Sequence, residues 1–159
     1  MQADVAVLHP PAAARWSGIR ILAVDDDADG LEVVRAALTA GGAEVATAAS
    51  AMEAIRLWER TPCDLLLCDL AMPDMDGFQV LNRIRDLDAA AGRVTAAVAL
   101  TAYTSDDFRL RCLSAGFHAH VGKPYRLNDL TQALNTALAE ARIPSPAPRA
   151  AGNARSGRA

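Results

Sequence analysis

Residues 19–27 of this 159-residue chain read Ile19-Arg20-Ile21-Leu22-Ala23-Val24-Asp25-Asp26-Asp27, a short, mostly apolar run that ends in three acids. A run of this length and character predicts a β-strand that is buried on both faces. A helix is predicted next, because Leu31, Val34 and Leu38 follow at spacings of three and four until two glycines end the pattern.

The alternation of strand and helix continues along the chain. Ser50 and Glu53 have the spacing of a capping box, which predicts the start of the second helix. Leucines at helical spacing predict a last helix over residues 127–138. Further strands are predicted around Val45 and at residues 65–68, 96–100 and 118–121. Short apolar strands that alternate with helices predict an α/β fold, in which helices cover both faces of a parallel sheet.

The composition excludes several classes of protein. Apolar residues make up 52% of the chain and charged residues 22%, as in ordinary globular domains. A formal charge of -3 and an aromatic content of 4% argue against direct binding of nucleic acid. No apolar run approaches the roughly 20 residues of a membrane-spanning helix, and the start of the chain does not resemble a secretory signal. With three cysteines and no C-x-x-C spacing, we expect a cytoplasmic protein without a membrane partner.

We expect one domain between two tails. Residues 1–18 are rich in Ala and Pro and are predicted to be a flexible lead-in. Residues 143–159 contain Pro and Arg without an acid and are predicted to be a flexible tail. The domain itself is expected to span residues 19–142.

Polar side chains follow four of the predicted strands. The acids at 25–27 follow the first strand, Asp69 the third and Thr101 the fourth, and Lys123 follows the fifth. The carboxyl ends of parallel strands form the ligand-binding edge of such a sheet, so these side chains are expected to lie together. Clustered carboxylates repel one another, and Mg²⁺ (or Mn²⁺) would relieve the repulsion. A lysine and a hydroxyl beside them suit a phosphoryl group.

Four blocks of sequence strengthen this hypothesis. They are Ile21-Leu22-Ala23-Val24-Asp25-Asp26-Asp27, Cys68-Asp69-Leu70-Ala71-Met72-Pro73-Asp74-Met75-Asp76-Gly77, Leu100-Thr101-Ala102 and Val121-Gly122-Lys123-Pro124. Together and in this order they resemble the receiver domain of two-component response regulators, over residues 19–142. The resemblance implies a flavodoxin-like, CheY-like doubly wound (βα)5 fold with a five-stranded parallel sheet in the order 2-1-3-4-5.

The resemblance also implies the chemistry of the site. Asp69 would be the phosphoacceptor, whose carboxylate attacks the phosphohistidine of a histidine kinase or phosphotransfer protein. Asp25 and Asp26 would hold Mg²⁺ together with Asp69 and the backbone carbonyl of Ala71, with Asp26 the more direct ligand of the first two.

Two further residues of the site face the phosphoryl group in this family. The hydroxyl of Thr101 would turn onto it, and Lys123, before a cis Pro124, would pair with one of its oxygens. Asp27 matches no ligand position and is predicted to cap the first helix.

The sequence departs from the family at the switch position. Many receivers carry Tyr or Phe three residues before the lysine, and the ring moves inward with the threonine; here that residue is His120. We predict that His120 still follows Thr101. Ala71 and Tyr103 flank the route of an attacking water, and we predict that Tyr103 governs the lifetime of the phosphoryl group more than Ala71 does.

Other polar residues have structural interpretations. Asp74 and Asp76 are predicted to form a turn in solvent rather than to bind metal. Cys68 is predicted to be a small, buried apolar residue. His118 and His120 share one face of the fifth strand, but no third ligand is identifiable, so we expect a structural role for the pair.

The expected function is therefore a regulatory phosphoacceptor, not an enzyme beyond its own phosphorylation and dephosphorylation. Its partners would be a histidine kinase or phosphotransfer protein and a downstream effector or fused domain, reached through the fourth helix, fifth strand and last helix. Many relatives form homodimers on phosphorylation. A looser likeness, in residues 115–120, is to receivers of hybrid sensor kinases. No helix-turn-helix remains outside the receiver, so no direct binding of nucleic acid is expected.

Two other classes of protein share part of this pattern. An aspartyl-phosphate-type, Mg²⁺-dependent phosphatase or phosphotransferase acting on a small substrate would use the same residue types. Such enzymes carry an acid two residues after the nucleophile, where this chain has Ala71, and a substrate-selecting cap, for which there is no room. A flavodoxin-like cofactor binder needs a phosphate-cradling loop after the first strand, where this chain has acids. The phosphatase remains the alternative.

Overall fold

A computed structural model describes residues 15–141 of the chain. Its five strands are all parallel and lie in the order β2-β1-β3-β4-β5, which confirms the predicted α/β fold and strand order. The strands are β1 (Arg20–Val24), β2 (Glu44–Ala48), β3 (Leu65–Asp69), β4 (Ala96–Thr101) and β5 (Ala119–Gly122). The helices are α3 (Ala28–Ala40), α4 (Ala51–Arg60), α5 (Gly77–Ala91), α6 (Asp106–Ala115) and α7 (Leu127–Glu140).

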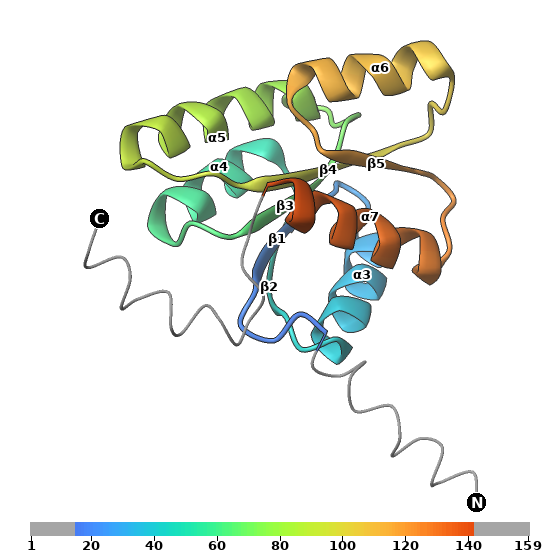
Figure 1. The fold of residues 1–159 in the computed structure, drawn as a ribbon, viewed down its shortest axis with the longest axis horizontal. Helices are drawn as coiled ribbons and strands as arrows, with labels where there is room; N and C mark the ends of the chain where they lie inside the picture. Colours follow the sequence, from blue (N-terminus) through green and yellow to red (C-terminus); the bar gives the residue numbers. More distant parts are fainter. Residues whose placement is uncertain (1–14, 142–159) are drawn as a thin grey trace, which may run out of the picture.

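The sheet is the middle of three layers (Figure 1). Helices α3 and α7 pack on one of its faces, where Leu38 and Leu134 lie in one buried apolar cluster. Helices α4, α5 and α6 cover the other face, where Trp58 and Ile84 belong to a second cluster. Because both faces are covered, the central strands β3 and β4 are buried along their whole length, as their continuous apolar sequence predicts.

The helices begin where short polar side chains cap them. Asp27 accepts a hydrogen bond from the N–H of Asp29, which confirms its predicted role as the cap of α3. Ser50 caps α4, and Asp76 forms a capping box with Gln79 at the start of α5. In α4 the predicted box is altered, since Glu53 accepts from the N–H of Ala49 and not from that of Ser50.

The packed domain begins earlier than the sequence predicted. Trp16 lies within the predicted flexible lead-in, yet its side chain is only 2% exposed and belongs to the core beneath α3 and α7. Its ring fills the space that a Cβ on Gly41 would need, so only glycine fits there. Its indole N–H donates to Asn135 of α7. A single indole between Arg15 and Ser17 gives no periodic signal, so the sequence pattern alone does not place Trp16 in the core. The remaining predictions for the two tails, at 1–14 and 142–159, concern residues outside the described part of the chain.

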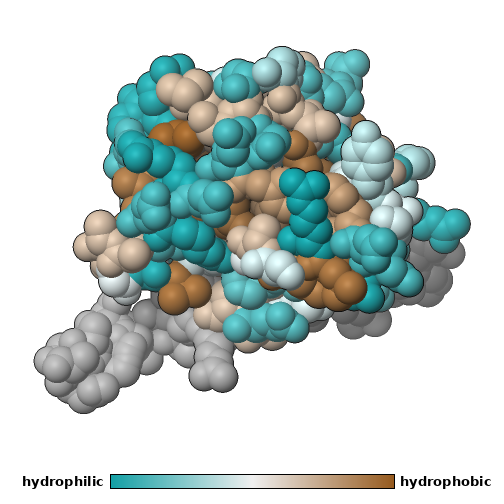
Figure 2. Space-filling model, turned by 90° about the horizontal axis from the view of Figure 1, so that it is seen from above, coloured by the Kyte–Doolittle hydropathy of each residue, from teal (hydrophilic) through white to brown (hydrophobic). Residues whose placement is uncertain are grey.

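Hydrophilic side chains cover most of the molecule as seen from above, and the apolar patches between them are small (Figure 2). Within residues 15–141 there is no helix long and apolar enough to span a membrane.

Candidate functional site

Strand pairing brings the predicted site residues to one edge of the sheet. Val24 is paired with Cys68, so that Asp25, directly after β1, and Asp69, the last residue of β3, lie at the same level. On the other side of β3, Asp69 is paired with Leu100, next to Thr101. Thr101 is in turn paired with Gly122, next to Lys123. The register of parallel strands therefore brings together four residues that lie up to 98 positions apart in the chain.

Three carboxylates form the centre of the site. Asp25, Asp26 and Asp69 each place one oxygen within 4.8 Å of the others. Asp25 and Asp69 are each only 5% exposed, whereas Asp26 is open to solvent. Asp27 contributes its N–H to the Oδ1 of Asp25 at 3.0 Å, but its own side chain caps α3. The three acids expected to be metal ligands thus converge. The side chain of the fourth acid, Asp27, instead binds a backbone N–H at the start of α3.

Lys123 is the counter-charge of this cluster. Its Nζ donates to Asp25 Oδ2 at 2.8 Å and lies 3.6 Å from Asp69 Oδ1. Burial by itself lowers the pKa of an ammonium group. The hydrogen bond to Asp25 and the charge of Asp69 outweigh it, so the pKa of Lys123 lies above its ordinary value. The lysine is therefore held in its charged form between two buried carboxylates, and its peptide bond to Pro124 is cis.

The environment of Asp69 disfavours its charge. Burial, followed by repulsion from Asp25, raises the pKa of Asp69 to about 6, against the opposing effects of Lys123 and the N–H of Ala71. That N–H donates to Asp69 Oδ1 at 3.3 Å. One positive charge does not fully compensate two buried negative ones. The cluster is therefore short of positive charge at neutral pH.

The donor set fits a hard divalent cation. Its side-chain donors are three carboxylates, two of which are withdrawn from water. Mg²⁺ prefers such oxygen ligands, commonly one or two carboxylates with water, and a dication would supply the missing positive charge. The exposed Asp26 leaves the site open to solvent on one side.

Thr101 lies at the end of β4 with its side chain buried. Its Oγ1 accepts a hydrogen bond from the N–H of Tyr103 at 2.9 Å, and its carbonyl accepts from the N–H of Lys123 at 2.7 Å. Through these two bonds Thr101 links the loop between β4 and α6 to the lysine, and its hydroxyl proton takes no part in either bond.

The loop after Asp69 is held by helix caps. Asp74 accepts from the N–H groups of Ala51 and Met52 at 3.3 and 3.1 Å, and so caps α4 from a distance. Asp74 and Asp76 are exposed, as predicted, but each binds the start of a helix rather than merely forming a turn. Gly77 is required by space, because a Cβ there would lie 2.6 Å from the carbonyl oxygen of Asp69.

A cavity of about 350 Å³ opens beside Asp69, and sequence reasoning did not find most of its wall. Ala71 and Tyr103 line it, as the prediction that they flank the approach to the acceptor requires. Phe78, Phe108 and Arg111 also line it, although they come from two different helices. Helical spacing marks Phe78 and Phe108 only as candidate core residues, and nothing in the sequence pairs them with Arg111.

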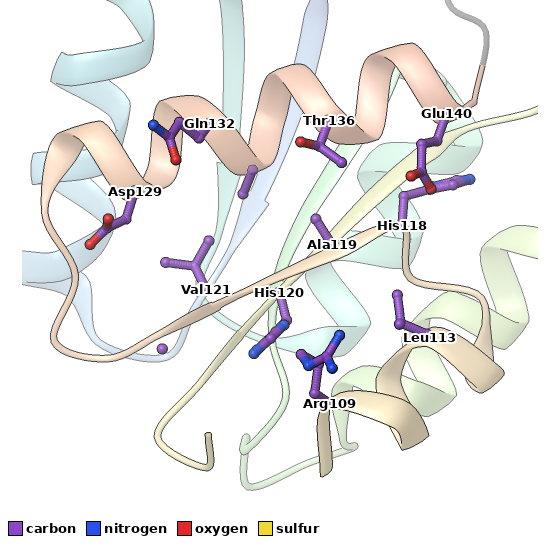
Figure 3. A pocket seen from close by; sticks show the side chains of 12 residues that line it. Arg109, Leu113, His118, Ala119, His120, Val121, Asp129, Gln132, Thr136 and Glu140 are labelled. Atoms are coloured by element: carbon purple, nitrogen blue, oxygen red, sulfur yellow. The ribbon is translucent and has the colours of Figure 1, made fainter. Parts of the chain in front are cut away.

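His118 and His120 line a different cavity, of about 610 Å³, between α6 and α7 (Figure 3). Strand β5 begins at Ala119, so His118 precedes the strand and does not belong to it as the sequence predicted. His118 points toward Glu140 and His120 lies beside Arg109. The Nδ1 of His118 accepts from the N–H of Ala97 at 3.1 Å, the structural role that was predicted. Burial lowers the pKa of both rings, and Arg85 and Arg109 lower it further for His118 and His120 respectively. Cys68 is fully buried as predicted, and burial raises the pKa of its thiol.

Comparison with known proteins agrees with this site. The family described as the response regulator receiver domain matches residues 21–135. An uncharacterized 14.6 kDa protein of Leptolyngbya boryana is 43% identical over 104 residues, which are 65% of this chain and 78% of that protein. The virulence sensor protein BvgS of Bordetella bronchiseptica is 34% identical over 89% of this chain, and the chain spans only 12% of that protein's length. The transcriptional regulatory protein TrcR of Mycobacterium tuberculosis is 34% identical over 79% of this chain and 47% of its own length.

Solved structures show the same architecture. The CheY-like response regulator receiver domain protein of Methanospirillum hungatei superposes with a TM-score of 0.69 and 32% identity, over 79% of this chain and 98% of that one. Chemotaxis protein CheY4 of Vibrio cholerae superposes with a TM-score of 0.70 and 28% identity, over 77% of this chain and all of that one. The fold and the acidic edge of the sheet define a regulatory domain of two-component signalling. This chain belongs to the response regulator receiver domain family.

Proposed function

We propose that Asp69 is the phosphoacceptor of this receiver. The observation that carries the proposal is the buried Asp25–Lys123–Asp69 arrangement, in which one ammonium group lies 2.8 and 3.6 Å from two carboxylates. An Asp69 carboxylate in contact with a fixed cation is positioned next to the group that would bind an incoming phosphoryl oxygen.

The proposed donor is the phosphohistidine of a histidine kinase or phosphotransfer protein. An Oδ of Asp69 forms a bond to phosphorus while the bond from phosphorus to the donor nitrogen breaks, and the electron pair of that bond stays with the imidazole. Lys123 then exchanges part of its contact with Asp69 for a phosphoryl oxygen. The hydroxyl of Thr101 accepts from the N–H of Tyr103 and keeps its own proton, which it donates to another phosphoryl oxygen.

Mg²⁺ is the proposed cofactor, held by Asp25, Asp26, Asp69 and the backbone carbonyl of Ala71. When bound, such an ion neutralises charge that develops on the transferring phosphoryl group. The carboxylate oxygens within 4.8 Å of one another support this assignment. Mn²⁺ has the same preference for oxygen ligands and would be expected to substitute.

The proposed output is a change in the surface formed by α6, β5 and α7. Thr101 is joined by hydrogen bonds to the loop before α6 and to Lys123 after β5, so its displacement moves both. We expect His120 to follow this movement, and the partner to be a downstream protein, a fused effector domain or a second copy of the chain. We place the domain in the cytoplasm and regard it as a regulator, with no catalytic activity beyond its own phosphorylation and dephosphorylation.

The decisive experiment is the intact mass after incubation with acetyl phosphate, with and without Mg²⁺. We expect one labile phosphoryl adduct that requires Mg²⁺ and is missing in Asp69→Asn. Asp86→Asn, an exposed acid on α5, is the matched control and should be phosphorylated like the wild type. An adduct that persists in Asp69→Asn would refute the assignment of the acceptor.

The switch is tested separately by NMR. Addition of beryllofluoride with Mg²⁺, a mimic of the phosphoryl group, should shift the ring resonances of His120 but leave an Asp69→Asn sample unchanged. Ring resonances that do not move in the wild type would show that His120 does not follow Thr101.

A further inference from the structure

We propose that Asp74 is a positioning residue of the phosphoacceptor site, which fixes the acceptor loop, residues 71–75, against the start of α4 and so raises the affinity of the site for Mg²⁺. This role rests on the proposed function, because the carbonyl of Ala71 in the acceptor loop is the proposed backbone ligand of the ion. Asp74 is not itself proposed as a ligand, since both of its carboxylate oxygens bind backbone N–H groups of α4.

The acceptor loop has few other attachments to the fold. Ala71 donates its N–H to Asp69, but within the described part of the chain no backbone–backbone hydrogen bond joins this loop to another element. Met72 and Met75 are half-buried and pack against the apolar cluster beneath the loop. Methionine is a flexible side chain, so this packing keeps the loop near the core without fixing the direction of its carbonyl groups. Hydrogen bonds are directional, and those of Asp74 supply what the packing lacks.

Asp74 forms two bonds to a helix that lies more than 20 residues earlier in the chain. Its Oδ1 accepts from the N–H of Ala51 at 3.3 Å, and its Oδ2 accepts from the N–H of Met52 at 3.1 Å. The first N–H groups of a helix have no partner within the helix, and a negative charge beside them is favourable. The bond from Met52 lowers the pKa of Asp74, and the bond from Ala51 adds to this effect. The carboxylate is therefore charged at neutral pH and binds both donors.

The start of α4 is a fixed anchor for these bonds. Ala51 is completely buried, and Ser50 before it caps the helix. At the end of β2, the carbonyl of Ala48 accepts from the N–H of Asp25 at 3.1 Å. This short stretch of chain therefore bonds both to Asp25 and to Asp74, and it holds together the two segments that carry proposed ligands of the ion.

The metal site and the start of α4 are then coupled in both directions. If the bonds of Asp74 raise the affinity for Mg²⁺, binding of Mg²⁺ must stabilise those bonds by the same factor. Loss of a residue that orients a metal ligand typically weakens metal binding about 10- to 100-fold. Asp74 acts on the carbonyl of Ala71 through the intervening backbone, so we expect an effect at the lower end, roughly tenfold.

The first test measures the dissociation constant of Mg²⁺ by NMR titration of the full chain without a phosphoryl donor. Asp74→Ala should raise this constant roughly tenfold, and Asp74→Asn, which keeps one acceptor oxygen without the charge, should raise it less. Ser50→Ala is the matched control, because it removes a cap from the same helix and leaves both bonds of Asp74 in place. The control should lower the midpoint of urea unfolding but leave the dissociation constant unchanged.

Hydrogen exchange measures the same coupling from the side of the helix. In the wild type, saturating Mg²⁺ should slow exchange of the Met52 N–H roughly tenfold. The N–H of Glu53 is the internal reference, because it bonds to Ser50 and should be slowed less. In Asp74→Ala the Met52 N–H should exchange equally fast with and without the ion. The wild-type measurement needs no variant, so it decides the role of Asp74 even if Asp74→Ala fails to fold.

The outcomes separate the possible failures. An unchanged dissociation constant in Asp74→Ala, an equal weakening in Ser50→Ala, or exchange at Met52 that does not respond to the ion would overturn the inference. A wild type that binds no Mg²⁺ would instead contradict the proposed metal site, on which the role of Asp74 depends. With acetyl phosphate, the Mg²⁺ concentration at half-maximal rate should rise in Asp74→Ala while the rate at saturating Mg²⁺ stays at the wild-type value. A lower saturating rate would assign Asp74 to the transfer step and not to the binding of the ion.

Discussion

Replacement of Asp69 by Asn is expected to stabilise the protein when no divalent ion is present. Asp69 is almost fully buried beside Asp25, and one lysine faces both carboxylates. Burial and repulsion raise the pKa of Asp69 from 3.8 to about 6, which corresponds to roughly 3 kcal/mol against the ionised form. The amide removes this charge at nearly constant volume. Because Lys123 loses one ionic contact in the variant, we expect a net gain of about 1–3 kcal/mol at pH 7.5.

The pH dependence of this stability difference follows from the raised pKa of Asp69. A carboxyl group whose pKa is raised by folding is penalised when it ionises, so the wild type loses stability as the pH rises from 3.8 through about 6. The full difference in the free energy of unfolding between wild type and Asp69→Asn is therefore present above about pH 6, and it should vanish toward about pH 4.

The assay is urea unfolding with EDTA, followed by circular dichroism. Asp86→Asn serves as control, since an exposed acid away from the cluster should change the free energy of unfolding by no more than about 0.5 kcal/mol. Mg²⁺ at ten times its dissociation constant should add about 1.4 kcal/mol to the wild type and less to Asp69→Asn. An Asp69→Asn variant that is no more stable than the wild type in EDTA, with a neutral control, would show that repulsion does not dominate this site.

Three further substitutions test the structure at other points. His118→Ala should cost about 1–3 kcal/mol at pH 8, because the buried N–H of Ala97 loses its acceptor. Since burial and Arg85 lower the pKa of His118, the wild type should lose stability as the pH falls through 6.5, and urea titrations of the variant between pH 7.5 and 5.5 should show a smaller loss. Gly77→Ala should destabilise by about 1–3 kcal/mol in the same assay, because its Cβ would lie 2.6 Å from the Asp69 carbonyl; an unchanged midpoint would mean that the loop relaxes freely. Tyr103→Ala should lose the phosphoryl group several-fold faster than the wild type in a mass-spectrometric time course, whereas Ala71→Gly should not. A Tyr103→Ala rate equal to that of the wild type would show that Tyr103 does not shield Asp69 from water.

Most of the fold could be predicted from local pattern. The apolar run before Asp25 and its counterparts specify strands, and leucines at helical spacing specify the helices between them. Because every strand is parallel to the next, the residue after each strand must lie at the same edge of the sheet. The convergence of Asp69, Thr101 and Lys123 was therefore predictable without coordinates.

Residues that act across the fold were not predictable in this way. Asp88 is only 3% exposed and is held by Arg85 and Arg93 at 3.6 and 3.9 Å, yet in the sequence nothing distinguishes it from Asp86, the other acid of α5. Trp16 belongs to the core because the C-cap of α3 is Gly41, which has no Cβ and so leaves room for the indole ring.

The amino-acid sequence by itself determined the order of strands and helices and the chemical groups at the strand ends, since both depend on short-range periodicity and on parallel geometry. Tertiary structure decided the environment of those groups. The pKa of Asp69, the contact of Lys123 with two carboxylates and the aromatic cavity beside them depend on distances between segments far apart in the chain. Such distances are set by the packing of whole helices on the sheet, and no local stretch of residues specifies them.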